Sequence, residues 1–392
     1  MTERAPLTGA LMAVLAASTA VMAAALHYQT PILPELGREF ALSKTEVGLI
    51  ATLLFGGFFC GNLLLLPLGD VMDKKRLIIA KLAGLAAMQA VIGLCTSYPV
   101  LLAASFLTGI FSSVSQDVVS ILAGLARPEE RGKAVGTVLT GLFLGILCGR
   151  IGAGLIADQF GWRWIYAMST VLVLTVLVTL HRRLPAAPAR ETMPYGALMR
   201  SLLSLYLQRP DVRRASLTQF CIGIGYGGFW ATLAPMLALM HGLGPAAAGI
   251  MAIPGAAGIF VARPAGRQMD RIGVRPVALA GAALVLSAFF VFAGALWTLA
   301  ALVLGAILLD CGLRAALVAN QALVTGADPN ARSRANSLLS AHVWGGNSAG
   351  AFLASAAFAA WGWIGVCAVG ALGGIGALAL QYTAPRNTPM PR

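Results

Sequence analysis

The sequence predicts an all-α membrane protein in which twelve transmembrane helices form two homologous six-helix bundles. Composition is the first observation behind this prediction: 58% of the 392 residues are hydrophobic, only 11% are charged, and the mean hydropathy is +0.81. A soluble globular chain carries roughly 25% charged residues, so lipid must surround much of this chain. The second observation is that loops and motifs recur about 200 residues further along the sequence.

Apolar runs of membrane-spanning length make up most of the chain. About 20 apolar residues cross the hydrocarbon core, and these runs are continuous, unlike the short alternating segments of a β-barrel. Helices are expected because backbone in lipid must satisfy its own hydrogen bonds. The twelve predicted spans are residues 7–28, 46–68, 77–97, 100–126, 134–156, 164–184, 215–238, 246–265, 276–296, 299–326, 335–358 and 364–382.

An internal duplication predicts the two bundles. Three features recur at nearly one offset: Asp70 and Asp270, Pro128 and Pro329, and the tryptophan pairs that begin at Trp162 and Trp361. The predicted domains are therefore residues 1–184 and 215–392, joined by a proline-containing linker at 185–214. Internal repeats of this kind are typical of secondary transporters, whose substrate site lies between the repeats near the bilayer midplane.

The distribution of basic residues predicts the orientation. Of the 28 lysines and arginines, 23 fall on one side when the loops are assigned alternately to the two sides of the membrane. Cytoplasmic loops carry such an excess, so the linker and both termini are expected in the cytoplasm and the chain in the plasma (inner) membrane. The formal net charge of +13 is thus an orientation signal and a contact for the lipid bilayer, and we expect no nucleic-acid partner.

A basic loop after the eighth span carries the clearest motif. Gly266, Asp270, Arg271, Gly273 and Arg275 follow the pattern Gly-x-x-x-Asp-Arg-x-Gly-x-Arg. This resembles the signature loop of the major facilitator superfamily, between the second and third spans of its half. An acid beside arginines can form a charge-assisted latch that holds one conformation of a transporter. The alternative is a solvated basic loop that serves topology alone.

The matching loop of the first half is degenerate. It keeps Asp70 and a basic cluster that includes Arg76, but Val71 and Asp73 replace a basic residue and a glycine of the pattern. We expect the same gating role for this loop, with the same alternative.

Further stretches are similar to bacterial arabinose-efflux and drug-efflux permeases of this superfamily. They are residues 28–34, 65–70, 141–154, 161–164, 228–230, 320–321 and 332–334. The resemblance implies the twelve-helix fold and proton-driven export of a small organic molecule such as a drug, sugar or metabolite. The resemblance does not identify the substrate, because this fold serves many functions. We expect the protein to be a monomer.

The fifth predicted span carries glycines at every fourth position. Gly141, Gly145 and Gly149 form a stripe that lets two helices approach closely. The stripe is similar to the antiporter motif of drug–proton exporters in the superfamily, but that motif continues with a proline where this chain has Arg150.

Four charged residues lie inside predicted spans and are functional candidates, because charges in the membrane are costly. They are Asp117, Arg150, Asp310 and Arg314. Asp117 and Arg150 are expected about 16 Å and about 25 Å from the cytoplasmic ends of their helices, so an ion pair between them is an open question. Asp310 and Arg314, one turn apart, can pair on one helix face. One interpretation is that an acid of these pairs titrates during transport, and the alternative is that each pair only neutralises charge in the membrane. Arg150 is alternatively a site for an anionic group of the substrate.

Polar and aromatic residues inside the spans are candidates to line the cavity, or else bond to a neighbouring helix: His27, Tyr28, Gln29, Gln116, Trp230, Asn320 and Gln321. No cluster of nucleophile, base and metal ligand appears, so we expect no enzyme, no metal and no cofactor. The predicted function is proton-coupled efflux by alternating access. The alternatives are an importer, a uniporter, or a membrane sensor or scaffold that does not transport.

Overall fold

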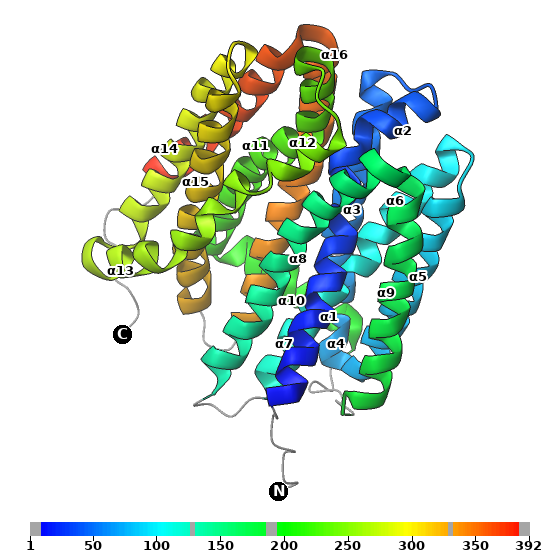
Figure 1. Cartoon of the computed structure of the whole chain (residues 1–392). Helices are drawn as coiled ribbons and strands as arrows, with labels where there is room; N and C mark the ends of the chain where they lie inside the picture. The colour runs from blue at the N-terminus through cyan, green and yellow to red at the C-terminus, as the bar shows by residue number, and fades with distance from the viewer. Residues whose placement is uncertain (1–8, 126–129, 186–193, 328–331, 384–392) are drawn as a thin grey trace, which may run out of the picture.

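The computed structural model describes residues 9–125, 130–185, 194–327 and 332–383, and these residues form helices and turns without strands. The first half contains seven main helices (Figure 1): α1 (Gly9–His27), α3 (Lys44–Cys60), α5 (Lys74–Leu94), α6 (Tyr98–Ser112), α7 (Val114–Leu125), α8 (Arg131–Phe160) and α9 (Trp162–Arg183). Helices α6 and α7 together form the fourth span. Shorter segments are η1 (Thr30–Ile32), α2 (Leu33–Glu39), η2 (Gly61–Leu65) and α4 (Leu68–Val71).

The second half follows a linker helix, α10 (Tyr195–Gln208). Its elements are α11 (Pro210–His241), α12 (Pro245–Ile250), η3 (Pro254–Phe260), α13 (Ala262–Ile272), α14 (Val274–Ala293), η4 (Gly294–Leu296), α15 (Leu299–Ala327) and α16 (Arg332–Tyr382). The eighth span is broken, since α12, η3 and α13 together cross the bundle. It runs to Ile272, seven residues beyond the predicted end.

Helix α16 supplies the last two predicted spans. Its 51 residues would extend about 77 Å at 1.5 Å per residue, more than twice the hydrocarbon thickness. The chain turns back at Gly362, where φ is +64° and ψ is −154°. Figure 1 shows this turn at the top of the molecule. The twelve-helix prediction is confirmed, with eleven long helical stretches of which one is double.

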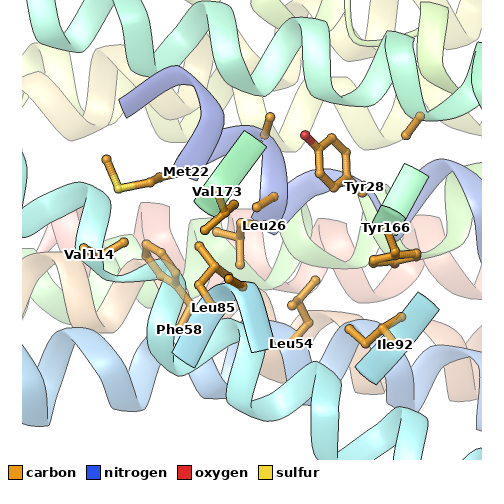
Figure 2. Packing of buried hydrophobic residues seen from close by; sticks show 14 of the residues in the cluster. Met22, Leu26, Tyr28, Leu54, Phe58, Leu85, Ile92, Val114, Tyr166 and Val173 are labelled. Atoms are coloured by element: carbon orange, nitrogen blue, oxygen red, sulfur yellow. The ribbon is translucent and has the colours of Figure 1, made fainter. Parts of the chain in front are cut away.

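Each half has its own packed interior. One cluster of buried side chains draws almost wholly on residues of the first half, and another lies wholly between Ile222 and Ala377. Figure 2 shows Leu26, Phe58 and Leu85 of three different helices meeting in the first cluster. Lipid tails are as apolar as these side chains, so close van der Waals packing holds such helices together.

The two halves pack most extensively along two helix pairs, α3 with α16 and α8 with α12. Small residues permit these contacts: a Cβ on Gly48 would overlap Ser355, and one on Gly154 would overlap the Pro245 carbonyl. We call the end at which α1 begins the proximal end, and the end that holds α2 and the turn of α16 the distal end (Figure 1). The contacts at Gly48 and Gly154 lie toward the distal end.

Candidate functional site

A buried arginine of the first half rests on an aromatic ring of the second half. The guanidinium carbon of Arg150 in α8 lies 3.5 Å from the ring centroid of Trp230 in α11. Arg150 is only 3% exposed. Desolvation strengthens a cation–π contact, because water no longer competes for the cation. This contact therefore joins the halves through a charged group in the membrane interior.

A second arginine makes a similar contact in the opposite direction, from the second half to an aromatic ring of the first half. Arg314 in α15 places its guanidinium carbon 4.6 Å from the ring centroid of Phe143 in α8. The Nε atom of Arg314 is 3.7 Å from Oδ1 of Asp310, one turn earlier on α15. The predicted pairing of Asp310 with Arg314 is thus present, although 3.7 Å is longer than a charge-assisted hydrogen bond.

Asp310 is held by the broken eighth span. Its Oδ2 atom accepts a hydrogen bond of 2.9 Å from the backbone N–H of Gly258 in η3. A Cβ on Gly258 would clash with this carboxylate and with the Arg314 side chain, so only glycine allows the approach. The carboxylate is 1% exposed.

These groups form one assembly, which we call the interface cluster: Phe143, Arg150, Tyr226, Trp230, Asp310 and Arg314. Arg150 is within electrostatic range of both Asp310 and Arg314. Arg150, Arg314, Phe143 and Tyr226 line a cavity of only about 20 Å³ between α8, α11, α15 and η3. A cavity of this size holds about one water molecule, so the halves are closed on each other here.

Larger cavities lie on either side of the cluster. The distal cavity, about 460 Å³, is lined by α2, α3, α11 and the start of α12. The proximal cavity, about 630 Å³, is lined by α3, η2, α10, α11 and α16. Along α11, Phe220 lines the proximal cavity, Ala234 lines the distal cavity, and Tyr226 of the cluster comes between them.

The fourth predicted charge, Asp117, is placed elsewhere. Its Oδ2 lies 2.5 Å from Nζ of Lys81 in α5, and Lys81 is 2% exposed. The structure thus answers the open question of an Asp117–Arg150 pair: the two do not pair. Lys81 is one of the 23 basic residues that were assigned to the cytoplasmic side of the membrane. This assignment to a loop was wrong, because α5 begins at Lys74 and Lys81 is two turns inside it. Its position within the predicted span 77–97 was the available signal.

Comparison with known proteins agrees with this architecture. The sequence model of the Major Facilitator Superfamily matches residues 13–262 and, again, 215–392. The chain belongs to the major facilitator superfamily. It is 31% identical to the uncharacterized transporter YgaY of Escherichia coli O157:H7 over 370 residues, 93% of each chain. It is 29% identical to the probable transporter SCO4007 of Streptomyces coelicolor, over 91% of this chain and 83% of that one.

A solved structure shows the same fold. The inward-facing, unoccupied crystal structure of a bacterial homolog to the human lysosomal transporter Spinster superposes with a TM-score of 0.72, at 19% identity, over 94% of each chain. The chain is therefore an integral, multi-pass membrane transporter of the major facilitator type, whose family members are not enzymes. Among the described residues, no group of three or more histidine, cysteine or acidic side chains could hold a metal ion.

The major facilitator signature loop has one glycine with a defined backbone role. Gly273 has a φ of +91° between α13 and α14, a conformation that favours glycine. Arg275 then donates hydrogen bonds to the carbonyls of Gln381 (3.1 Å) and Tyr382 (2.5 Å) at the end of α16. Asp270 and Arg271 are exposed, and Asp270 has no ion pair with any described residue.

The matching first-half loop is less informative. Asp73 accepts a 3.0 Å hydrogen bond from the Arg76 backbone N–H and caps α5, while Arg76 itself is exposed. The Asp70 side chain lies outside the described residues. The latch predicted for these two loops stays a prediction.

The glycine stripe of α8 faces α1. A Cβ on Gly141, Gly145 or Gly149 would overlap backbone atoms of Ala16, Ala20 or Ala24, respectively. Arg150 follows directly, and its side chain reaches the second half. The stripe thus brings α8 against α1 while the next side chain reaches Trp230.

Three of the predicted cavity residues lie around the end of α1. His27 bonds the Ala23 carbonyl through Nδ1 (2.8 Å) and meets the ring of Trp344 of α16 edge-on. The Gln29 amide donates to Ser105 (2.8 Å). Tyr28 lines a groove between α1, α8 and α9, outside the interface cluster.

The remaining candidates are spread along other helices. Gln116 is half-buried in α7. Asn320 accepts a 3.0 Å hydrogen bond from Gln381, which links α15 to the end of α16. Gln321 donates to Asn336 (3.0 Å) and is exposed. Of the predicted cavity residues, Trp230 makes a ring contact with a buried charge, and His27 lies within electrostatic range of Arg150. Sequence reasoning missed Phe143, Tyr226 and Gly258, which carry no charge and so gave no signal.

Proposed function

We propose that this transporter exports a small organic molecule across the inner membrane in exchange for protons, by alternating access around the interface cluster. The observation that carries the proposal is the buried carboxylate of Asp310, which lies where the two halves meet and is balanced between Arg314 and the N–H of Gly258. A proton site and a contact between the halves thus share one group.

The cavities support alternating access. One cavity lies at each end of the bundle, and the interface cluster between them encloses only about 20 Å³. A rocking motion of the halves about this level would join the cluster to one cavity while it closes the path to the other. The broken eighth span supplies discontinuous backbone at this depth, as is typical of transporter binding sites.

Proton coupling follows from the position of Asp310. Protonation removes the only negative charge of the cluster and so releases Arg314 from its ion pair, which changes the attraction between α15 and its neighbours. Arg150, Arg314 and the Gly258 N–H are the charged and polar groups that face this carboxylate. The coupling acid is thus Asp310, and Asp117 is the acid of a structural pair with Lys81.

Direction and orientation rest on the sequence. The glycine stripe of α8 is similar to the antiporter motif, which favours export. The excess of basic residues on one side favours a cytoplasmic proximal end, with both termini there. The protein would act as a monomer, since one chain contains both halves of the cluster.

The test uses inverted membrane vesicles with an imposed proton gradient, read by a pH-sensitive dye, and a panel of drugs, sugars and organic acids. We expect a substrate to collapse the gradient with the wild type but not with Asp310→Asn. The matched control is the double variant Lys81→Met/Asp117→Leu, which removes the other buried ion pair and should keep the response.

Three outcomes contradict the proposal. Collapse by Asp310→Asn at the wild-type rate would remove Asp310 from coupling. Loss in the double variant with retention in Asp310→Asn would move coupling to Asp117. Substrate flux that never moves protons would indicate a uniporter.

A further inference from the structure

We infer that the substrate of this transporter is an amphiphilic organic anion, whose acid group binds between Arg150 and Arg314. The inference rests on the proposed function only in that the interface cluster is taken to lie on the transport path. It names the substrate class.

The charge balance of the cluster carries the inference. Two guanidinium groups face a single carboxylate, that of Asp310, so the cluster has an excess positive charge. Arg150 makes no ion pair within 4 Å with any described residue, and its buried Nε atom has no hydrogen-bond partner. A buried cation normally requires a counter-charge because desolvation penalises it strongly. An anionic substrate supplies the charge that the protein lacks.

Apart from the hydrogen bond between the Arg150 and Tyr226 side chains, the orientation of the two arginines leaves guanidinium donors available for a ligand. Arg150 and Arg314 each place the flat face of the guanidinium against a ring, Trp230 and Phe143 respectively. The N–H groups of a guanidinium lie in its plane, so a face-on ring contact does not use them. These planar forks match the geometry of a carboxylate, sulfonate or phosphate group.

The two arginines come from opposite halves. Arg150 belongs to α8 and Arg314 to α15, and both line the same small cavity. An anion that bonds to both would hold the halves together at this level, and its departure would release them. The acid group of the substrate thereby contributes binding energy that depends on the relative position of the halves.

The rest of the cavity lining is apolar and requires an apolar body on the substrate. It includes Phe143, Ile146, Leu147, Ala252, Ala256 and Ile259, beside Tyr226. In this closed conformation the space admits about one water molecule. The anion therefore enters when the halves separate here, and its apolar part then lies against these side chains.

The experiment measures charge-selective binding to the purified full-length protein in detergent. Thermal unfolding is followed with naphthoate against its neutral isostere naphthamide, and with octanoate against octanamide. Ligands that bind only the folded state raise the unfolding temperature. We expect each carboxylate to bind at least about tenfold more tightly than its amide, the effect of one charge-assisted contact.

Two variants and a matched control locate the site. Arg150→Gln should lose the preference for the carboxylates, and Arg150→Lys, which keeps the charge but not the planar fork, should retain part of it. The control is Arg163→Gln. Arg163 also stacks on a tryptophan, Trp162, at 4.3 Å, but it pairs with Glu39 outside the interface cluster, so this variant should bind as the wild type does.

The outcomes separate this inference from the proposed function. Equal binding of amides and carboxylates by the wild type, or binding of neither, overturns the inference, and no variant has to fold for that result. A carboxylate preference that survives in Arg150→Gln overturns the assigned site. Charge-selective binding without proton movement in vesicles leaves the inference standing and removes only the coupling. Proton-coupled export that is restricted to neutral or cationic compounds overturns the inference and leaves the proposed function standing.

Discussion

Arg150 of α8 and Trp230 of α11 form a cation–π contact of 3.5 Å between the two halves of the transporter. The sequence raised the carboxylate of Asp117 as a possible partner of Arg150, but in the structure the guanidinium of Arg150 lies against the ring of Trp230. A ring compensates a cation only partly, and neither this ring nor the neutral Tyr226 side chain that hydrogen-bonds Arg150 carries a negative charge. The contact therefore keeps a buried arginine in place without neutralising it.

Replacement of Trp230 tests the strength of this contact. Trp230→Leu should lower the free energy of unfolding by about 2 kcal/mol or more, since the contact is desolvated and a large buried ring is lost. Trp230→Phe should cost less because it keeps a smaller aromatic face. Chemical denaturation in mixed micelles measures both. Equal losses for the two variants would show that the ring contributes volume alone.

The pair of Lys81 and Asp117 should behave as a structural unit. Removal of one member breaks a buried ion pair, so Lys81→Met or Asp117→Asn should each destabilise the protein by about 3–5 kcal/mol. The double variant Lys81→Met/Asp117→Leu should recover most of this loss, because apolar side chains of similar volume replace a buried pair well. Thermal unfolding of the purified variants measures the coupling. Additive losses in the double variant would contradict it.

The fold could be predicted from the sequence because hydropathy reveals the membrane spans and the internal repeat reveals the two bundles. Span length, the duplication and the signature loop each depend on local composition. Asp310 and Arg314 were also predictable, since residues four apart on one helix share a face.

Contacts between helices were not predictable in the same way. Depth estimates start from predicted helix ends, and α5 begins at Lys74, three residues before its predicted start. Lys81 lies within the predicted span 77–97, but it was counted among the cytoplasmic basic residues and was therefore left out of the search for the partner of Asp117. Trp230 was recognised only as a cavity candidate, because an aromatic ring in an apolar helix gives no sign that it faces a cation.

The glycine stripe of α8 provides a prediction with an internal control. Gly145→Ala should destabilise the protein by about 1–3 kcal/mol, because a Cβ would overlap the Ala20 backbone and push α1 from α8. Gly152→Ala, on the same helix, meets no atom within 4 Å, so it should be neutral or slightly stabilising. Thermal unfolding of the two variants decides the matter. Equal unfolding temperatures for the two variants would show that the close approach of α1 to Gly145 does not limit the side chain at this position.

The two glycines of the signature loop should differ in their tolerance of a side chain. Gly273 has a φ of +91°, and an alanine there is strained by about 1–2 kcal/mol. Gly266 lies within α13, where a Cβ meets nothing within 4 Å, so Gly266→Ala should unfold at the wild-type temperature or above. Gly273→Ala should unfold earlier and weaken the α13–α14 turn that positions Arg275 on the end of α16. A Gly273→Ala protein as stable as Gly266→Ala would show that the turn relaxes to another conformation without cost.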